Sequence, residues 1–299
     1  MNRMKTVAPL LVLGVSLAGF AALIYLSWEQ ASAITWTIDW VPLVIAFVSY
    51  SLSLGAATLT WHLIFSSVAP SGSFRTNARI YIVSNAARRL PGGIWGIGSR
   101  LYLYRLEGFS EVVTSIAIAL ETAIVGVSVL LVMLVLVPFV SLPESISSNW
   151  TVLAVVAIVF AACLHPRVLV RGLNFVSAKL AKRPMDRAGS IRTRSVFCWL
   201  AWYMVAWLIA GVMAFFVMRS VYAVPLTLLP AMLGAYVVTG AVSMIVYIAP
   251  SGFGITELAL AVLLTQWVPV PVAVATPLAI RVFTTASEIA WAMVLIRWR

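Results

Sequence analysis

The stretch from residue 112 to residue 140 reads VVTSIAIALETAIVGVSVLLVMLVLVPFV. Apart from Glu121 it contains no charged side chain, and it is longer than the roughly 20 apolar residues that a helix needs to cross a bilayer. A helix satisfies its own backbone hydrogen bonds, which a hydrocarbon environment requires. The stretch therefore predicts a transmembrane helix that carries one carboxylate.

Other stretches on both sides share this apolar character. They span 7–28, 40–69, 151–165, 196–218, 226–249 and 271–297, of which 151–165 is short. Hydrophobic residues make up 63% of the chain and charged residues only 10%, too few to cover the surface of a soluble domain. We predict an all-α fold, a polytopic transmembrane helical bundle of about seven or eight spans that forms a single domain over residues 1–299.

Two segments, 77–108 and 250–268, interrupt this pattern with proline, glycine and charge. The breaks are at Pro91, Gly92 and Gly93 in the first segment and at Pro250, Gly252 and Gly254 in the second. Proline withholds a backbone donor and glycine disfavours a continuous helix, so the chain is expected to bend within the membrane. We predict two re-entrant segments.

The breaks occupy similar places in two halves of the chain, 1–165 and 196–299, joined by the basic segment 166–195. Matching broken segments mark the binding site in many transporter folds. The halves are only loosely alike. The basic segment is either an amphipathic helix on anionic headgroups or a loop that sets topology.

The distribution of Lys and Arg predicts a protein of the cell membrane whose amino terminus is cytoplasmic. Residues 7–28 are long enough to remain as an anchor, although Ala31-Ser32-Ala33 also resembles a signal-peptide cleavage site. By the same count both interrupted segments begin at the cytoplasmic side. The side of the carboxy terminus, and with it the choice between seven and eight spans, stays open.

Arg88, Arg89 and Arg100 surround the first break. Guanidinium groups bind phosphate through paired, charge-assisted hydrogen bonds, which favours a site for a phosphate-bearing headgroup. Alternatively, these arginines lie in a cytoplasmic loop and only determine topology. The glycines do not form a dinucleotide or P-loop motif, because no strand precedes them and no Gly-Lys-Ser/Thr follows.

Charges inside the predicted spans are few, and each is a candidate site residue. Arg281, Thr284 and Glu288 recur at helical spacing, so they share one face of the last span. Because an unpaired charge in the bilayer is costly, we expect Arg281 to pair with Glu257, Glu121 or Glu288. Glu257 has a second interpretation, in which it caps the helix that begins after the second break.

These motifs resemble the transmembrane region of lysylphosphatidylglycerol synthases, the flippase half of multiple peptide resistance factors, over nearly the whole chain. The resemblance rests on Leu90-Pro91-Gly92-Gly93 with the trailing Arg100, on Glu121, on the Pro-x-Gly-x-Gly-x-x-Glu stretch 250–257, and on Arg281. It implies movement of a phospholipid or lipid-linked headgroup between leaflets, along polar residues near the two breaks. No aminoacyl-transferase domain lies within these residues, so the resemblance does not imply lipid aminoacylation.

We therefore expect a lipid flippase-like transporter whose substrate-binding residues are Arg88, Arg89, Arg100, Glu121, Glu257, Arg281 and Glu288. The expected partners are anionic membrane lipids and a separate lipid-modifying enzyme or glycosyltransferase, with no nucleic acid. The alternatives are an integral accessory subunit or enzyme of lipid or glycolipid modification, and a structural membrane partner. No HExxH, G-x-S-x-G, paired-aspartate or metal-ligand motif is present, so we predict no enzymatic activity, no metal and no cofactor.

Overall fold

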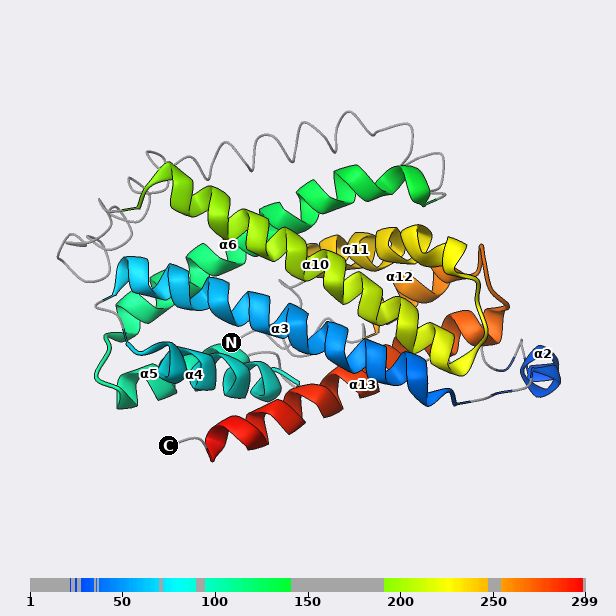
Figure 1. The fold of residues 1–299 in the computed structure, drawn as a ribbon, viewed down its shortest axis with the longest axis horizontal. Helices are drawn as coiled ribbons and strands as arrows, with labels where there is room; N and C mark the ends of the chain where they lie inside the picture. The colour runs from blue at the N-terminus through cyan, green and yellow to red at the C-terminus, as the bar shows by residue number, and fades with distance from the viewer. Residues whose placement is uncertain are drawn as a thin grey trace, which may run out of the picture.

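The computed structural model of the chain describes residues 28–34, 38–69, 72–89, 95–140, 191–246 and 254–297, with isolated positions at 22, 25 and 36. Every regular element in these ranges is a helix, as Figure 1 shows. The helices are α2 (Trp28–Ala33), α3 (Trp40–Val68), α4 (Phe74–Ala87), α5 (Trp95–Leu106), α6 (Glu111–Leu136), α10 (Thr193–Val221), α11 (Leu229–Val246), α12 (Ile255–Leu264) and α13 (Val270–Ile296), with short 3-10 turns at Val137–Phe139 and Leu226–Leu228. The predicted all-α membrane bundle is confirmed.

Five of these helices are long and apolar enough to cross a membrane. They are α3, α6, α10, α11 with the turn before it, and α13, which match five of the predicted spans. The predicted spans 7–28 and 151–165 and the basic segment 166–195 lie outside the described residues. The total of about seven or eight spans therefore stays a prediction.

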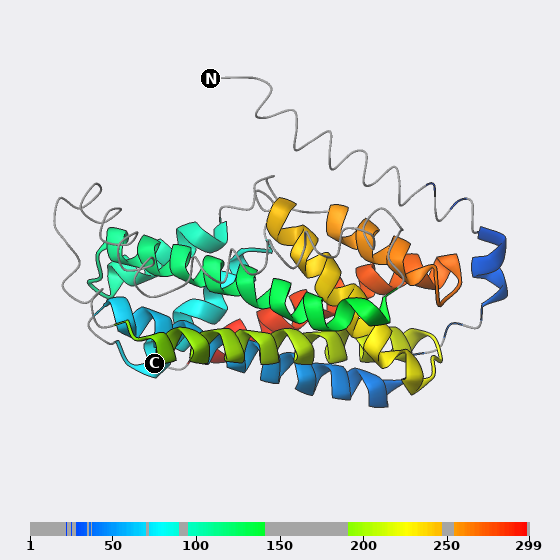
Figure 2. The ribbon, with the colours of Figure 1, turned by 90° about the horizontal axis from the view of Figure 1, so that it is seen from above.

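The longest helix contact joins α3 and α10, which run antiparallel side by side (Figures 1 and 2). The backbone N–H of Asp39 donates to the carbonyl of Ser220 at 2.9 Å, at the start of α3 and the end of α10. Further along, Ser53 Oγ donates to the carbonyl of Ala206 at 2.8 Å. The two bonds fit one antiparallel register, because the 14 residues from Asp39 to Ser53 on α3 match the 14 residues from Ser220 back to Ala206 on α10. This pair is the spine of the bundle.

Helix ends are set by local capping. Asp39 precedes α3 and its side chain accepts from the backbone N–H of Val41 at 3.0 Å. Ser73 precedes α4 and accepts from the backbone N–H of Thr76 at 3.1 Å. Each cap satisfies a donor that the first turn of a helix leaves unpaired. The chain can therefore leave one helix and enter the next within a few residues.

The first interrupted segment, 77–108, contains α5 and most of α4, which pack side by side, and the second, 250–268, contains α12, which packs on α11 of the preceding predicted span. Residues 90–94 and 247–253, which contain Pro91, Gly92, Gly93, Pro250 and Gly252, lie outside the described part of the chain. Gly96 allows α5 to approach α4 closely, since a Cβ there would lie 2.8 Å from the Cβ of Arg88. Both pairs contribute residues to the centre of the bundle.

The two helix pairs enter the bundle from opposite ends, as both views show (Figures 1 and 2). The pair α4–α5 lies at the end where α10 begins, whereas α11 starts just after α10 ends and α12 leads back toward the start of α13. The α4–α5 and α11–α12 pairs therefore begin at opposite ends of the bundle. The second interrupted segment begins at residue 250, outside the described residues, so the expectation that both segments begin at the cytoplasmic side stays a prediction.

The described elements follow one order twice: a long helix, a helix pair, and another long helix. The first run is α3, α4, α5 and α6, and the second is α10, α11, α12 and α13. The runs interlock, because α4 packs on α13 and α11 packs on α6. This exchange brings polar side chains from distant parts of the sequence to the middle of the molecule.

Candidate functional site

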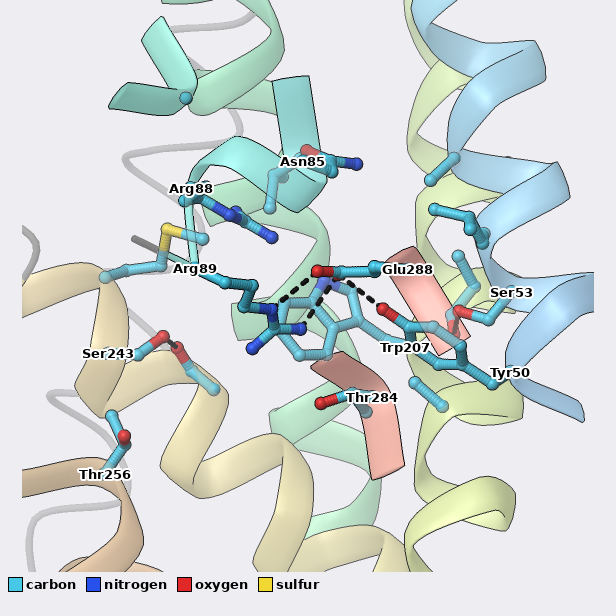
Figure 3. Close-up of a pocket in the computed structure, with 18 of the residues that line it drawn as sticks. Tyr50, Ser53, Asn85, Arg88, Arg89, Trp207, Ser243, Thr256, Thr284 and Glu288 are labelled. Atoms are coloured by element: carbon cyan, nitrogen blue, oxygen red, sulfur yellow. Dashed lines mark hydrogen bonds and ion pairs between the residues drawn. The ribbon is translucent and has the colours of Figure 1, made fainter. Parts of the chain in front are cut away.

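A cavity of about 440 Å³ lies at the centre of the bundle, and side chains from every described helix except α2 line it. Figure 3 shows part of its wall. Its lining includes all the side chains predicted as site residues: Arg88, Arg89, Arg100, Glu121, Glu257, Arg281 and Glu288. The fold thus gathers into one polar cavity charges that are scattered across the sequence.

The first ion pair joins α5 to α6. Arg100 Nη1 lies 2.5 Å from Glu121 Oε2, and the hydroxyl of Tyr203 donates to Glu121 Oε1 at 2.7 Å. Arg100 Nε also donates to Ser84 Oγ at 3.1 Å. Arg100 and Glu121 are each only 7% exposed. Arg100 is therefore not a loop arginine that merely sets topology.

Two aromatic rings also contact the Arg100 guanidinium. Its Cζ lies 4.3 Å from the ring centre of Trp61 and 4.7 Å from that of Tyr81. A cation over an aromatic face is stabilised by the negative face of the ring, and more strongly when water is excluded. The ring contacts and the carboxylate together fix the orientation of this arginine.

The second ion pair joins the end of α4 to α13 (Figure 3). Arg89 binds Glu288 in a bidentate manner, with Nε 2.6 Å from Oε2 and Nη2 2.8 Å from Oε1. The hydroxyl of Tyr50 donates to Glu288 Oε1 at 2.5 Å. Glu288 is 1% exposed, so its charge depends on these donors.

The Arg100–Glu121 and Arg89–Glu288 ion pairs are built alike. In each, a tyrosine of one spine helix and an arginine of the α4–α5 pair donate to a carboxylate on α6 or α13. Tyr50 and Tyr203 stand three residues before Ser53 and Ala206, which contact each other where α3 and α10 cross. Because these helices are antiparallel, the tyrosines lie on opposite sides of the crossing, roughly 9 Å apart along the axis at 1.5 Å per residue.

The third ion pair joins α12 to α13. Glu257 Oε1 accepts from Arg281 Nη1, while Glu257 Oε2 accepts from the backbone N–H of Gly254 at 2.8 Å and from Thr256 Oγ1 at 2.9 Å. The sequence allows Glu257 two roles, helix cap or ion-pair partner, and it has both. Gly254 has φ +95°, a conformation in which a side chain would be strained.

The expectation that Arg281 pairs with a glutamate is confirmed, and Glu257 is its partner. Arg281, Thr284 and Glu288 all face the cavity, as their spacing on the last span predicts. Glu121 and Glu288 instead take Arg100 and Arg89. Within the described ranges, no group of three or more His, Cys, Asp or Glu side chains could hold a metal ion.

Sequence reasoning missed Tyr50, Tyr203 and Asn85. Each tyrosine lies within a long apolar span, and its hydroxyl carries no signal until its carboxylate partner is known. Asn85 lies next to the arginines of the first break and could have been chosen by that position. Its Oδ1 accepts from Arg100 Nη2 at 3.5 Å.

The comparison with protein families agrees with this geometry. Residues 10–292 match the family described as lysylphosphatidylglycerol synthase TM region. The chain belongs to this family. As a member of the lysylphosphatidylglycerol synthase TM family, it is a multi-pass membrane protein involved in lipid modification or transport. No curated protein matches the chain.

Proposed function

We propose that this chain is a flippase-like transporter, without enzymatic activity, that moves a phospholipid or lipid-linked anionic headgroup between the leaflets of the cell membrane. Transport is passive or is driven by protons or by the membrane potential. The chain works beside a separate enzyme that modifies the lipid.

The observation that carries this proposal is the central cavity with its three Arg–Glu pairs, in each of which the glutamate is buried. A charged headgroup crosses hydrocarbon only at high cost, and polar groups that already lie at mid-bundle lower that cost. Buried ion pairs add little to stability compared with apolar packing, since the desolvation of both charges opposes their attraction. Three such pairs around one cavity therefore favour a function for the cavity over a purely structural role.

The arrangement of the helix pairs supports the same proposal. The α4–α5 and α11–α12 pairs reach the cavity from opposite ends, and their residues Arg100 and Glu257 face it. Interrupted helices beside a midplane site are a recurring feature of transporters that expose one site alternately to two sides. Movement of one pair against α6 or α13 would open the cavity toward one leaflet.

The test is reconstitution of the purified chain into liposomes with labelled phosphatidylglycerol, its lysyl derivative and a polyprenyl-phosphate lipid. Leaflet exposure and product formation are followed together. We expect leaflet exchange of at least one lipid, no modified product, and loss of exchange in Glu288→Gln. The control is Arg105→Gln, which alters only the exposed Arg105–Glu111 pair.

Modified lipid without leaflet exchange would contradict the transporter proposal and would favour an enzyme or accessory subunit. If lipid exchange survives in Glu288→Gln, the cavity is not the transport pathway.

A further inference from the structure

The charges around the cavity do not balance. Its lining contains four arginines, Arg88, Arg89, Arg100 and Arg281, and three glutamates, Glu121, Glu257 and Glu288. Each glutamate binds one arginine, which leaves Arg88 as the surplus charge. Among the lining residues, the cavity thus has a net charge of +1 and no carboxylate without an arginine.

Arg88 is placed so that its charge is available to a ligand in the cavity. It follows the last residue of α4, and Figure 3 shows its guanidinium directed toward the cavity beside Arg89. Within the described part of the chain, its side chain forms no ion pair and no hydrogen bond. An arginine that sets topology would resemble Arg79 or Arg105, which bind Glu107 and Glu111 near the end of the bundle. Arg88 instead lines the cavity.

Asn85 offers a second donor one turn earlier on α4. Its Oδ1 faces Arg100, and because a guanidinium only donates, this contact assigns the amide oxygen. The amide nitrogen Nδ2 then has no acceptor among the described residues. Asn85 is 7% exposed and lines the cavity, so its Nδ2 is placed to donate to a ligand there. Residues three apart share one side of a helix, which brings Asn85 and Arg88 together.

We propose that Arg88 and Asn85 form the phosphate subsite of the cavity, and that the subsite selects a lipid headgroup with one net negative charge over a headgroup with a net positive charge. This inference rests on the proposed function. A phosphodiester monoanion neutralises the surplus charge and accepts hydrogen bonds from both free donors. A lysyl ester with net charge +1 raises the cavity to +2 and finds each carboxylate already bound to an arginine.

Calorimetry on the full chain in detergent tests this selection. The ligands are short-chain phosphatidylglycerol, its lysyl ester, and glycerophosphoglycerol, which is the same phosphodiester monoanion without acyl chains. We expect phosphatidylglycerol to bind about tenfold more tightly than the lysyl ester, because its net negative charge offsets the surplus charge of the cavity, whereas the net positive charge of the lysyl ester adds to it. Arg88→Gln should weaken the binding of phosphatidylglycerol about tenfold and remove its preference over the lysyl ester. Arg88→Lys should keep part of this preference. Arg105→Gln should change neither the affinity nor the preference.

Equal or tighter binding of the lysyl ester, or an unchanged preference in Arg88→Gln, would overturn the subsite. Glycerophosphoglycerol that binds as tightly as the lipid would overturn the assignment of the subsite to a lipid headgroup. Because Arg88 is exposed and forms no ion pair with the described residues, its variants are expected to fold, and size-exclusion chromatography is the check. Selective binding without leaflet exchange would refute the transport proposal alone, whereas fastest exchange of the lysyl ester would refute the subsite alone.

Discussion

At the scale of single residues, the three cavity carboxylates share one design: both oxygens of each are hydrogen-bonded. Glu121 accepts from Tyr203 and Arg100 on separate oxygens. Glu288 accepts from Arg89 on both oxygens and from Tyr50 on one. A buried carboxylate is tolerable only when its lone pairs are satisfied in this way. Each donor should therefore contribute measurably to stability.

Replacement of Tyr50 or Tyr203 by Phe removes a hydroxyl that donates to a buried carboxylate. Hydrogen bonds to charged groups contribute about 1.5–3 kcal/mol, so each variant should lose roughly that much free energy of unfolding. Thermal unfolding in detergent measures the change. Tyr102→Phe on the exposed side of α5 is the control and should unfold as the wild type does. Equal midpoints for Tyr50→Phe, Tyr203→Phe and Tyr102→Phe would refute this role of the buried hydroxyls.

Glu257 and Arg281 should be energetically coupled. Arg281→Gln leaves the Glu257 carboxylate with its helix-cap donors but without its ion pair. Either single change to Gln leaves one charge without its partner. The double variant should therefore be less destabilised than the sum of the single variants, by about 1 kcal/mol or more. Unfolding of the four proteins provides this cycle.

A coupling near zero would mean that the Glu257–Arg281 pair does not act as a unit. Transport by the same variants separates two roles. If folded Glu257→Gln and Arg281→Gln move lipid as the wild type does, these charges are structural.

At the scale of elements, the α4–α5 pair depends on close backbone contact at one glycine. A Cβ on Gly96 would lie 2.8 Å from Arg88 Cβ and 3.2 Å from the carbonyl oxygen of Ser84. Gly98, two residues later on the same helix, has open space where its Cβ would be, with no neighbouring atom within 4 Å. The two glycines thus differ in packing although they are neighbours in sequence.

Gly96→Ala should force α5 away from α4 and displace Arg88, at a cost of about 1–3 kcal/mol that is typical of overpacking. Lipid exchange and binding of phosphatidylglycerol should both fall. Gly98→Ala is the matched control, and it should keep activity and gain up to about 1 kcal/mol from its higher helix propensity. Equal activity and stability of the two variants would show that the close approach at Gly96 is unimportant.

At the scale of the whole molecule, positive charge is concentrated at one end. The described arginines at the end where α10 begins and α13 finishes are Arg75, Arg79, Arg105, Arg192, Arg194 and Arg297. The opposite end has Arg219 together with Glu29 and Asp39. The positive-inside rule predicts that the first end faces the cytoplasm. This prediction would place the carboxy end of α13 inside.

The opposite entry of the two helix pairs can be tested by labelling. In a background with Cys163 and Cys198 replaced by Ser, Ser110→Cys marks the connection after α5 and Gln266→Cys the connection after α12. Both positions are exposed. A membrane-impermeant maleimide applied to intact cells should label Gln266→Cys alone, and Ser110→Cys should react only after the cells are opened.

Equal labelling of both cysteines from outside would place the two helix pairs on the same side. If neither cysteine is labelled in intact cells, the two helix pairs again lie on the same side, which is then the cytoplasmic side.

The sequence by itself determined that this protein lies in a membrane, because long apolar runs have no other stable solvent. It also indicated which charges gather at the cavity, since any charge within an apolar span is conspicuous, and all seven charged residues predicted to bind substrate line the cavity. The proline and glycine breaks likewise indicated where the helices are interrupted.

Only the tertiary structure decided the partners of these charges. Arg89 and Glu288 are 199 residues apart, and no local pattern connects them. Their contact depends on the packing of α4 against α13, which follows from how the whole bundle fills space. The same holds for Tyr50 and Tyr203, and for the surplus charge of Arg88, because a surplus among the described residues is defined only once every other cavity charge has found its partner.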